Sequence, residues 1–129
     1  MSFLRVCLCF VASSMVFTGA HGSGKATYYN PSDGLGACGF LNSDSEKVAA
    51  VSPDTYDRYG KLPNPNDAPI CRKCATVTSR KSGATVTVRI VDKCPGCQTK
   101  HIDLSPAAFK KLAPLHLGVI PVDWYLHDC

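Results

Sequence analysis

Two aspartates flank a short cysteine motif in residues 86–106, which read VTVRIVDKCPGCQTKHIDLSP. Asp92 ends an alternating apolar run, a Cys-Pro-Gly-Cys motif occupies 94–97, and Asp103 follows a few residues later. Carboxyl groups held on rigid backbone can exchange protons with a polar substrate. Acids scattered over a surface are not positioned for this. Asp92 and Asp103 are therefore the first candidate site residues.

Each aspartate also has a purely structural interpretation. An aspartate at a strand end, such as Asp92, often accepts hydrogen bonds from backbone donors of the following turn. Asp103 can do the same, but Ser105 already suits the N-cap of the next helix, which favours a ligand-binding role for Asp103.

The first 22 residues have the features of a secretory signal peptide. Arg5 precedes the apolar run Val6–Phe17, and small residues follow that run. The run is too short to cross a membrane, and no other run approaches the roughly 20 apolar residues that a transmembrane helix needs. We expect an extracellular domain over 23–129, with no membrane association.

The remaining chain is expected to form one monomeric domain, because it has no repeat, linker or low-complexity tract.

The full sequence has 14 basic and 10 acidic residues, a formal net charge of +4. The charges are scattered, so we expect no nucleic-acid partner, although an exported basic protein favours acidic wall polymers. No motif calls for a cofactor.

Six cysteines lie in residues 23–129, and their spacing has two interpretations. Cys71-x2-Cys74 with Cys94-x2-Cys97 suits a zinc ribbon, whereas the signal peptide and the even count favour disulfides and no metal. Six cysteines allow fifteen pairings, and the residues alone do not select one, although the 94–97 turn can close on itself. The full set is Cys38, Cys71, Cys74, Cys94, Cys97 and Cys129.

Alternating β-branched and apolar residues predict a mainly β domain. A helix should begin after Ser105 with Pro106 at its first position, and Pro53–Gly60 suits one helical turn. Lys81-Ser82-Gly83 indicates a hairpin turn. The fold class is therefore a small β-barrel with one short α-helix, and the expected strand segments are 24–30, 48–52, 74–79, 84–91 and 118–128.

Five motifs in order make the resemblance to one family specific. They are ATYY (26–29) with GLGACG (34–39), Cys71-x2-Cys74, VRIVDKCPGC (88–97), HIDLS (101–105) and GVIPVDWYLHDC (118–129). With them the chain resembles the double-psi β-barrels of expansin first domains, loosenins, barwin, rare lipoprotein A and the endoglucanases of glycoside hydrolase family forty-five.

That resemblance implies a six-stranded, disulfide-stapled double-psi β-barrel with a shallow polysaccharide-binding groove. Asp103 takes the position of the endoglucanases' proton-donating acid, and only one of Tyr28 and Tyr29 can face the groove because they alternate along a strand. Trp124 is expected in the core. The implied substrate-binding residues are Thr27, Tyr28, Tyr29, Asp33, Asp92 and Asp103, and the implied disulfides are Cys38–Cys71, Cys74–Cys129 and Cys94–Cys97.

Three positions depart from the family pattern. Asn30 and Pro31 stand where the endoglucanases carry a catalytic-base aspartate, and Asp33, in a glycine-rich loop, is a better ligand contact than base. Cys94 replaces a tyrosine of microbial expansins. Expansins also continue into a second, carbohydrate-binding domain where this sequence ends, so we expect weaker binding to long polymers.

The function expected from the sequence is therefore a secreted, non-hydrolytic protein that binds and loosens cell-wall polysaccharide: cellulose, xylan, chitin or peptidoglycan. One alternative is a weak endoglucanase or a peptidoglycan lytic transglycosylase, because a transglycosylase can work with a single acid. Another is a barwin-like defence protein or a protease inhibitor.

Overall fold

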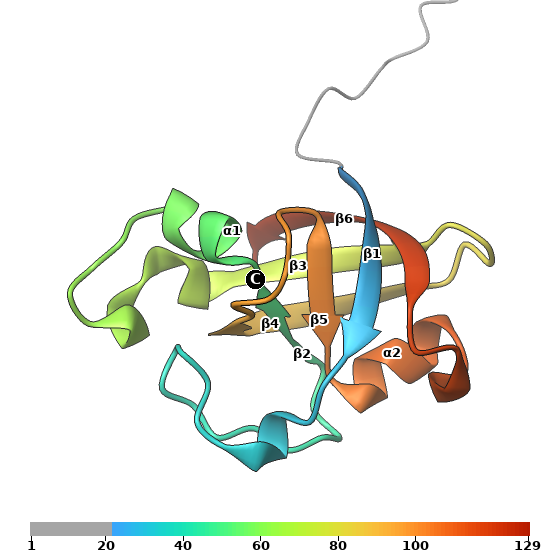
Figure 1. The fold of residues 1–129 in the computed structure, drawn as a ribbon, viewed down its shortest axis with the longest axis horizontal. Coiled ribbons are helices and arrows are strands. Elements are labelled where there is room, and N and C mark those ends of the chain that lie inside the picture. Colours follow the sequence, from blue (N-terminus) through green and yellow to red (C-terminus); the bar gives the residue numbers. More distant parts are fainter. Residues whose placement is uncertain (1–21) are drawn as a thin grey trace, which may run out of the picture.

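The computed structural model describes residues 22–129, which form a closed six-stranded barrel (Figure 1). The expected signal peptide lies outside the described residues, except Gly22, which begins the first strand. Around the barrel the order is β1-β5-β2-β4-β3-β6. The strands are β1 (Gly22–Tyr28), β2 (Val48–Val51), β3 (Lys73–Ser79), β4 (Thr85–Lys93), β5 (His101–Leu104) and β6 (Ile120–Asp128). The predicted six-stranded double-psi class is confirmed.

Two parallel pairs connect distant parts of the chain, β1 with β5 and β2 with β4, and the other four pairs are antiparallel. The predicted hairpin is β3–β4, with Gly83 at a positive φ of 75° in its turn. The sequence motif HIDLS was not predicted as a strand. It forms β5, the short central strand between β1 and β2, because Ile102 and Leu104 alternate into the core.

The core fills the barrel and extends under the longer helix. That helix is α2 (Pro106–Leu112), capped by Ser105 and begun by Pro106 as predicted. Phe109 is fully buried and meets the Tyr28 ring edge to face, with the ring centroids 5.0 Å apart. Trp124 is also in the core, as expected, and its indole nitrogen donates to the Lys100 carbonyl at 3.0 Å.

A second α-helix, α1 (Pro53–Arg58), replaces the single turn predicted there. Ser52 caps it by accepting from the Thr55 backbone nitrogen, and Tyr56 is buried at 1% exposure, with its hydroxyl donating to the Pro65 carbonyl. Cap and burial together stabilise a helix of this length. Neither α-helix of the described part is long and apolar enough to cross a membrane.

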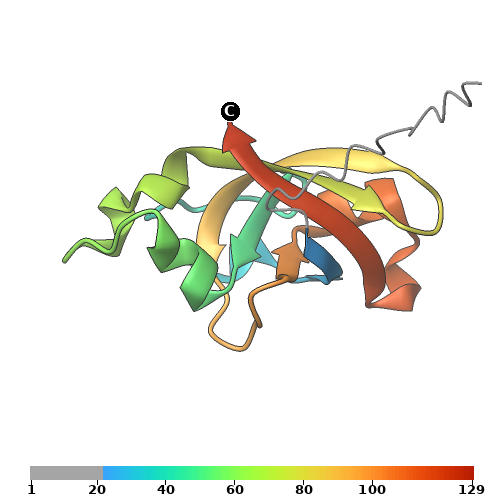
Figure 2. The ribbon, with the colours of Figure 1, turned by 90° about the horizontal axis from the view of Figure 1, so that it is seen from above.

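Three disulfides join the pairs that the resemblance implies: Cys38–Cys71, Cys74–Cys129 and Cys94–Cys97. The first lies buried beside the Tyr56 hydroxyl, and the second ties the start of β3 to the end of β6. The third disulfide, Cys94–Cys97, closes a turn in the loop between β4 and β5. This loop projects from the barrel in Figure 2. Sulfur atoms paired in this way offer no thiolates for a zinc ribbon.

The three disulfides should contribute unequally to stability. On the chain-entropy model, closing the long loops contributes about 4 kcal/mol each, whereas the four-residue ring contributes only about 2 kcal/mol. We expect Cys94→Ala with Cys97→Ala to lower the free energy of unfolding by about half as much as Cys38→Ala with Cys71→Ala. Urea denaturation of both double variants measures this, and equal losses would contradict it.

Candidate functional site

The parallel pairing of β1 with β5 creates the centre of the site. Its register sets Thr27 beside Asp103, and both side chains are half-buried on the same face. The Thr27 hydroxyl donates to Asp103 Oδ1 at 2.8 Å, and its oxygen lies 2.6 Å from His101 Nε2. The three side chains therefore form a continuous hydrogen-bonded chain.

His101 was not among the predicted site residues. The sequence did contain a pattern that points to His101. It is two residues from Asp103, and in a strand residues two apart lie on the same face. Burial lowers the pKa of His101, Lys25 lowers it further, and the Asp103 carboxylate opposes both effects. The imidazole is thus biased toward its neutral form.

Asp103 has the environment of a proton donor. Burial raises its pKa above the ordinary value, the Thr27 hydrogen bond and His101 act against this, and the Asp92 charge adds to it. A carboxylate oxygen of Asp103 lies within 4.8 Å of the sulfur atoms of Cys94 and Cys97. The acid and the cysteine turn are therefore parts of one site.

Asp92 has the structural role considered from the sequence. Its Oδ1 accepts from the backbone nitrogens of Ala37 and Lys93, both at 2.8 Å, and so fastens the 34–39 loop to the end of β4. Gly36 permits this approach, because a Cβ there would lie 2.5 Å from the Val91 carbonyl oxygen. The other oxygen, Oδ2, makes no hydrogen bond within the described residues.

The tyrosine pair divides as the alternation requires. Tyr28 packs on Phe109 at the edge of the core, so its place among the substrate-binding residues stays a prediction. Burial raises the pKa of Tyr29, and the charges of Asp92 and Asp103 raise it further. The Tyr29 hydroxyl is buried without a hydrogen-bond partner in the described part of the chain. It is therefore an unsatisfied buried polar group.

Asp33 is not brought to this cluster. It lies exposed in the 3-10 turn Pro31–Asp33, and its side chain makes no hydrogen bond or ion pair among residues 22–129. Asn30, at the expected base position, donates to Asp44, and the Ser32 backbone nitrogen donates to the same carboxylate, so these bonds lower the pKa of Asp44. Asp44 is thus an ionised carboxylate already engaged by two donors.

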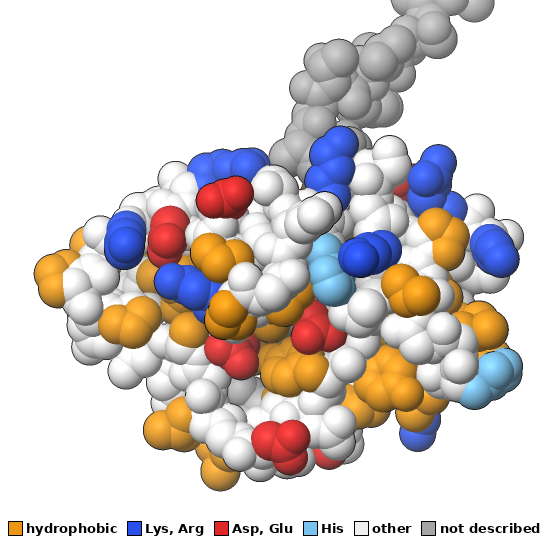
Figure 3. Space-filling model, in the orientation of Figure 1, with side chains coloured by type: hydrophobic (Ala, Val, Ile, Leu, Met, Phe, Trp, Pro, Cys, Tyr) orange, Lys and Arg blue, Asp and Glu red, His pale blue; other side chains and the backbone are white. Residues whose placement is uncertain are grey.

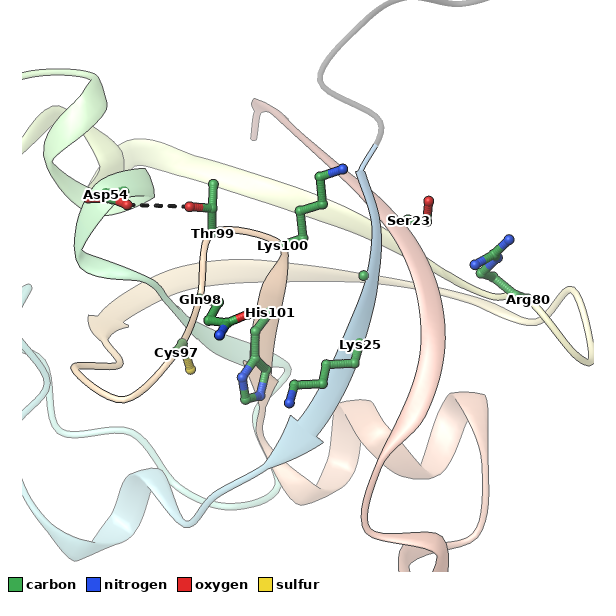
Figure 4. Close-up of a pocket in the computed structure, with 10 residues that line it drawn as sticks. Ser23, Lys25, Asp54, Arg80, Cys97, Gln98, Thr99, Lys100 and His101 are labelled. Atoms are coloured by element: carbon green, nitrogen blue, oxygen red, sulfur yellow. Dashed lines mark hydrogen bonds between the residues drawn. The ribbon is translucent and has the colours of Figure 1, made fainter.

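Beside the cluster lies an open, basic pocket (Figure 4). Lys25, Lys100 and His101 line it together with Cys97, and Arg80 lies at its far end. Figure 3 shows Lys and Arg side chains over the upper part of this face and acidic side chains around an apolar surface at its centre. The basic side chains of this pocket and the Thr27–His101–Asp103 cluster thus form one continuous polar surface.

A closed six-stranded barrel with two parallel strand pairs, carrying a half-buried acid beside an open pocket, defines the class of double-psi β-barrel proteins. The chain belongs to the double-psi β-barrel family described as lytic transglycolase, whose model matches residues 21–124.

Relatives within this class differ in how much of their length is matched. The papain inhibitor of Streptomyces mobaraensis is 42% identical over 84% of this chain and 73% of its own. A solved Streptomyces papain inhibitor has a TM-score of 0.73 at 40% identity, with 82% of this chain and 93% of that chain covered. A Clavibacter michiganensis expansin variant in complex with cellohexaose has a TM-score of 0.65 at 29% identity, and covers 83% of this chain but 50% of its own.

The Thr27 hydroxyl should control the protonation of Asp103. Thr27→Ala removes a hydrogen bond that favours the carboxylate, so the pKa of Asp103 should rise further, whereas Thr27→Ser should leave it close to that of the wild type. Carboxyl ¹³C NMR titration of both variants measures the midpoint. An unchanged midpoint in Thr27→Ala would show that the hydroxyl does not stabilise the charged form.

Proposed function

We propose that this protein is a secreted inhibitor of papain-type cysteine proteases. The observation that carries the proposal is the extent of similarity to the Streptomyces papain inhibitor, which spans most of both chains at 42% identity. The solved inhibitor is matched over 93% of its length, whereas the Clavibacter expansin is matched over only half. The similarity therefore covers nearly the full length of the solved inhibitor.

One edge of the groove has the properties of a protein-binding surface. In the 34–47 loop, Leu35 and Leu41 are 73% and 66% exposed, and Phe40 stacks under Arg89 with the guanidinium 4.4 Å from the ring centroid. Exposed apolar side chains of this size favour a protein partner. We call Leu35, Phe40 and Leu41 the apolar edge.

The apolar edge is also held in place before any partner arrives. The Cys38–Cys71 disulfide and the Ala37–Asp92 hydrogen bond fasten its loop, and the Gly36 nitrogen donates to the Phe40 carbonyl within it. A preorganised loop loses little conformational entropy on binding, and so retains more of the interaction free energy.

The apolar edge gives the first test. Leu35→Ser combined with Leu41→Ser should weaken inhibition of papain by at least about tenfold, because two exposed apolar anchors are lost. The matched control is Leu117→Ser with Val119→Ser, which are 50% and 52% exposed in the segment between α2 and β6. Hydrolysis of a fluorogenic peptide by papain is the measurement. Failure of the wild type to inhibit papain would overturn the proposal.

A second function is favoured by two carboxyl groups that can accept further hydrogen bonds: Asp92, whose Oδ2 makes none within the described residues, and the half-buried Asp103. Glycan hydroxyls are donors of the kind that both carboxyl groups accept. The expansin relative solved with cellohexaose supports a β-glucan as this ligand. In this role the groove binds and loosens wall polysaccharide without cutting it.

Cellohexaose binding tests the groove separately. Asp103→Ala should weaken binding by roughly tenfold or more, because a hydrogen bond to a charged or acidic group contributes about 1.5–3 kcal/mol. Asp123→Asn, an exposed aspartate of β6, is the matched control. Isothermal titration calorimetry gives the affinities. Reducing sugar released from cellulose, or anhydro-sugar from peptidoglycan, would contradict the non-cutting role.

A further inference from the structure

The Cys94–Cys97 disulfide is presented differently from the other two. Cys94 is half-exposed, Pro95 and Gly96 are exposed, and only Cys97 is buried, at 7% exposure. The Cys38–Cys71 sulfurs lie in the core, in residues that are 3% and 6% exposed. Figure 2 shows the loop between β4 and β5 projecting beyond the barrel. Cys94 is therefore more exposed than either residue of the Cys38–Cys71 pair.

Opening this disulfide would leave the fold held by the two long-range bridges. Its sequence separation is 3 residues, against 33 and 55 for the others. The turn also has its own hydrogen bonds, from the Cys94 nitrogen to the Val51 carbonyl at 2.7 Å and from the Cys97 nitrogen to the Cys94 carbonyl at 3.1 Å. The backbone around it can thus persist when the sulfur atoms separate.

Two neighbouring features suit the cleavage of this bond. Asp103 brings a carboxyl oxygen within 4.8 Å of both sulfur atoms, and burial raises the pKa of that carboxyl above its ordinary value. On the other side, Lys25 and His101 line the basic pocket together with Cys97 (Figure 4). A nearby cation stabilises a departing thiolate, and a nearby acid can protonate it.

We propose that Cys94–Cys97 is a thiol–disulfide exchange site for the catalytic thiolate of a target cysteine protease, with Asp103 as the proton donor. This inference rests on the proposed inhibitory function. The protease thiolate attacks Cys94 Sγ, a new sulfur–sulfur bond forms, and the Cys94–Cys97 bond breaks. Cys97 Sγ leaves with the electron pair and takes the proton of Asp103, which becomes a carboxylate. The disulfide is itself the oxidant, so no further reagent is required.

The test uses papain from which the activating thiol has been removed. Papain and the protein are mixed, free thiols are blocked with N-ethylmaleimide in acid, and the products are examined by non-reducing electrophoresis and peptide mass mapping. The expected product is a papain–Cys94 mixed disulfide with one blocked thiol at Cys97, released by dithiothreitol. Cys94→Ala with Cys97→Ala should form no adduct and should lose at least about tenfold in inhibition.

The outcomes separate this inference from the proposed function. Inhibition that the double variant retains in full, with no adduct, overturns the exchange site and leaves the inhibitory function standing. Absence of both inhibition and adduct overturns both. Cys129, an exposed residue in another disulfide, is an internal control: an adduct there as abundant as that at Cys94 would show that exposure alone governs the reaction and would overturn the assignment.

The role of Asp103 is tested with glutathione as the thiol, which does not depend on protease binding. The second-order rate constant, calculated per glutathione thiolate, should fall as pH rises through the pKa of Asp103, because only the protonated carboxyl donates. Asp103→Asn should abolish that step in the profile. Thr27, Tyr29, Asp92 and His101 face the same carboxyl and are unchanged in the variant. Identical profiles for both proteins would overturn proton donation by Asp103.

Discussion

The parallel pairing of β1 with β5 is the constraint on which the rest of the site depends. Parallel strands cannot be joined by a tight turn, so the chain makes a long excursion through β2, β3 and β4 before β5 returns beside β1. The register then places residue 27 against residue 103, and one hydroxyl orients both a carboxyl and an imidazole. A shift of β5 by one residue would turn His101 and Asp103 to the opposite face of the sheet from Thr27.

Burial distinguishes two acids that the sequence presents as similar. Asp103 is half-buried on β5, and this burial raises its pKa above the ordinary value. Asp92 accepts two backbone hydrogen bonds at the end of β4, so one of its oxygens has a structural role. The proton chemistry therefore centres on one carboxyl, while the other maintains the shape of the groove.

Much of this arrangement follows from the sequence, and the remainder depends on contacts between distant residues. The hairpin and the Ser105 cap have local signals, and the ordered motifs carry the barrel class and the disulfide pairs. The four residues of β5 are too few for a periodic pattern to be decisive, and the role of His101 becomes evident only when β1 lies beside it. Tyr28 and Tyr29 could be separated only once Phe109 was in place.

Asp92 Oδ1 accepts hydrogen bonds from Ala37 and Lys93, and so connects the loop of the apolar edge to the end of β4. The carboxylate that fastens the 34–39 loop also forms part of the groove, so a macromolecule pressing on the loop and a glycan bound at Asp92 act on the same anchor. A protease seated on that loop would lie beside Asp92, which is also part of the proposed glycan site. The two ligands should therefore compete, and by reciprocity each should reduce the affinity of the other by the same factor.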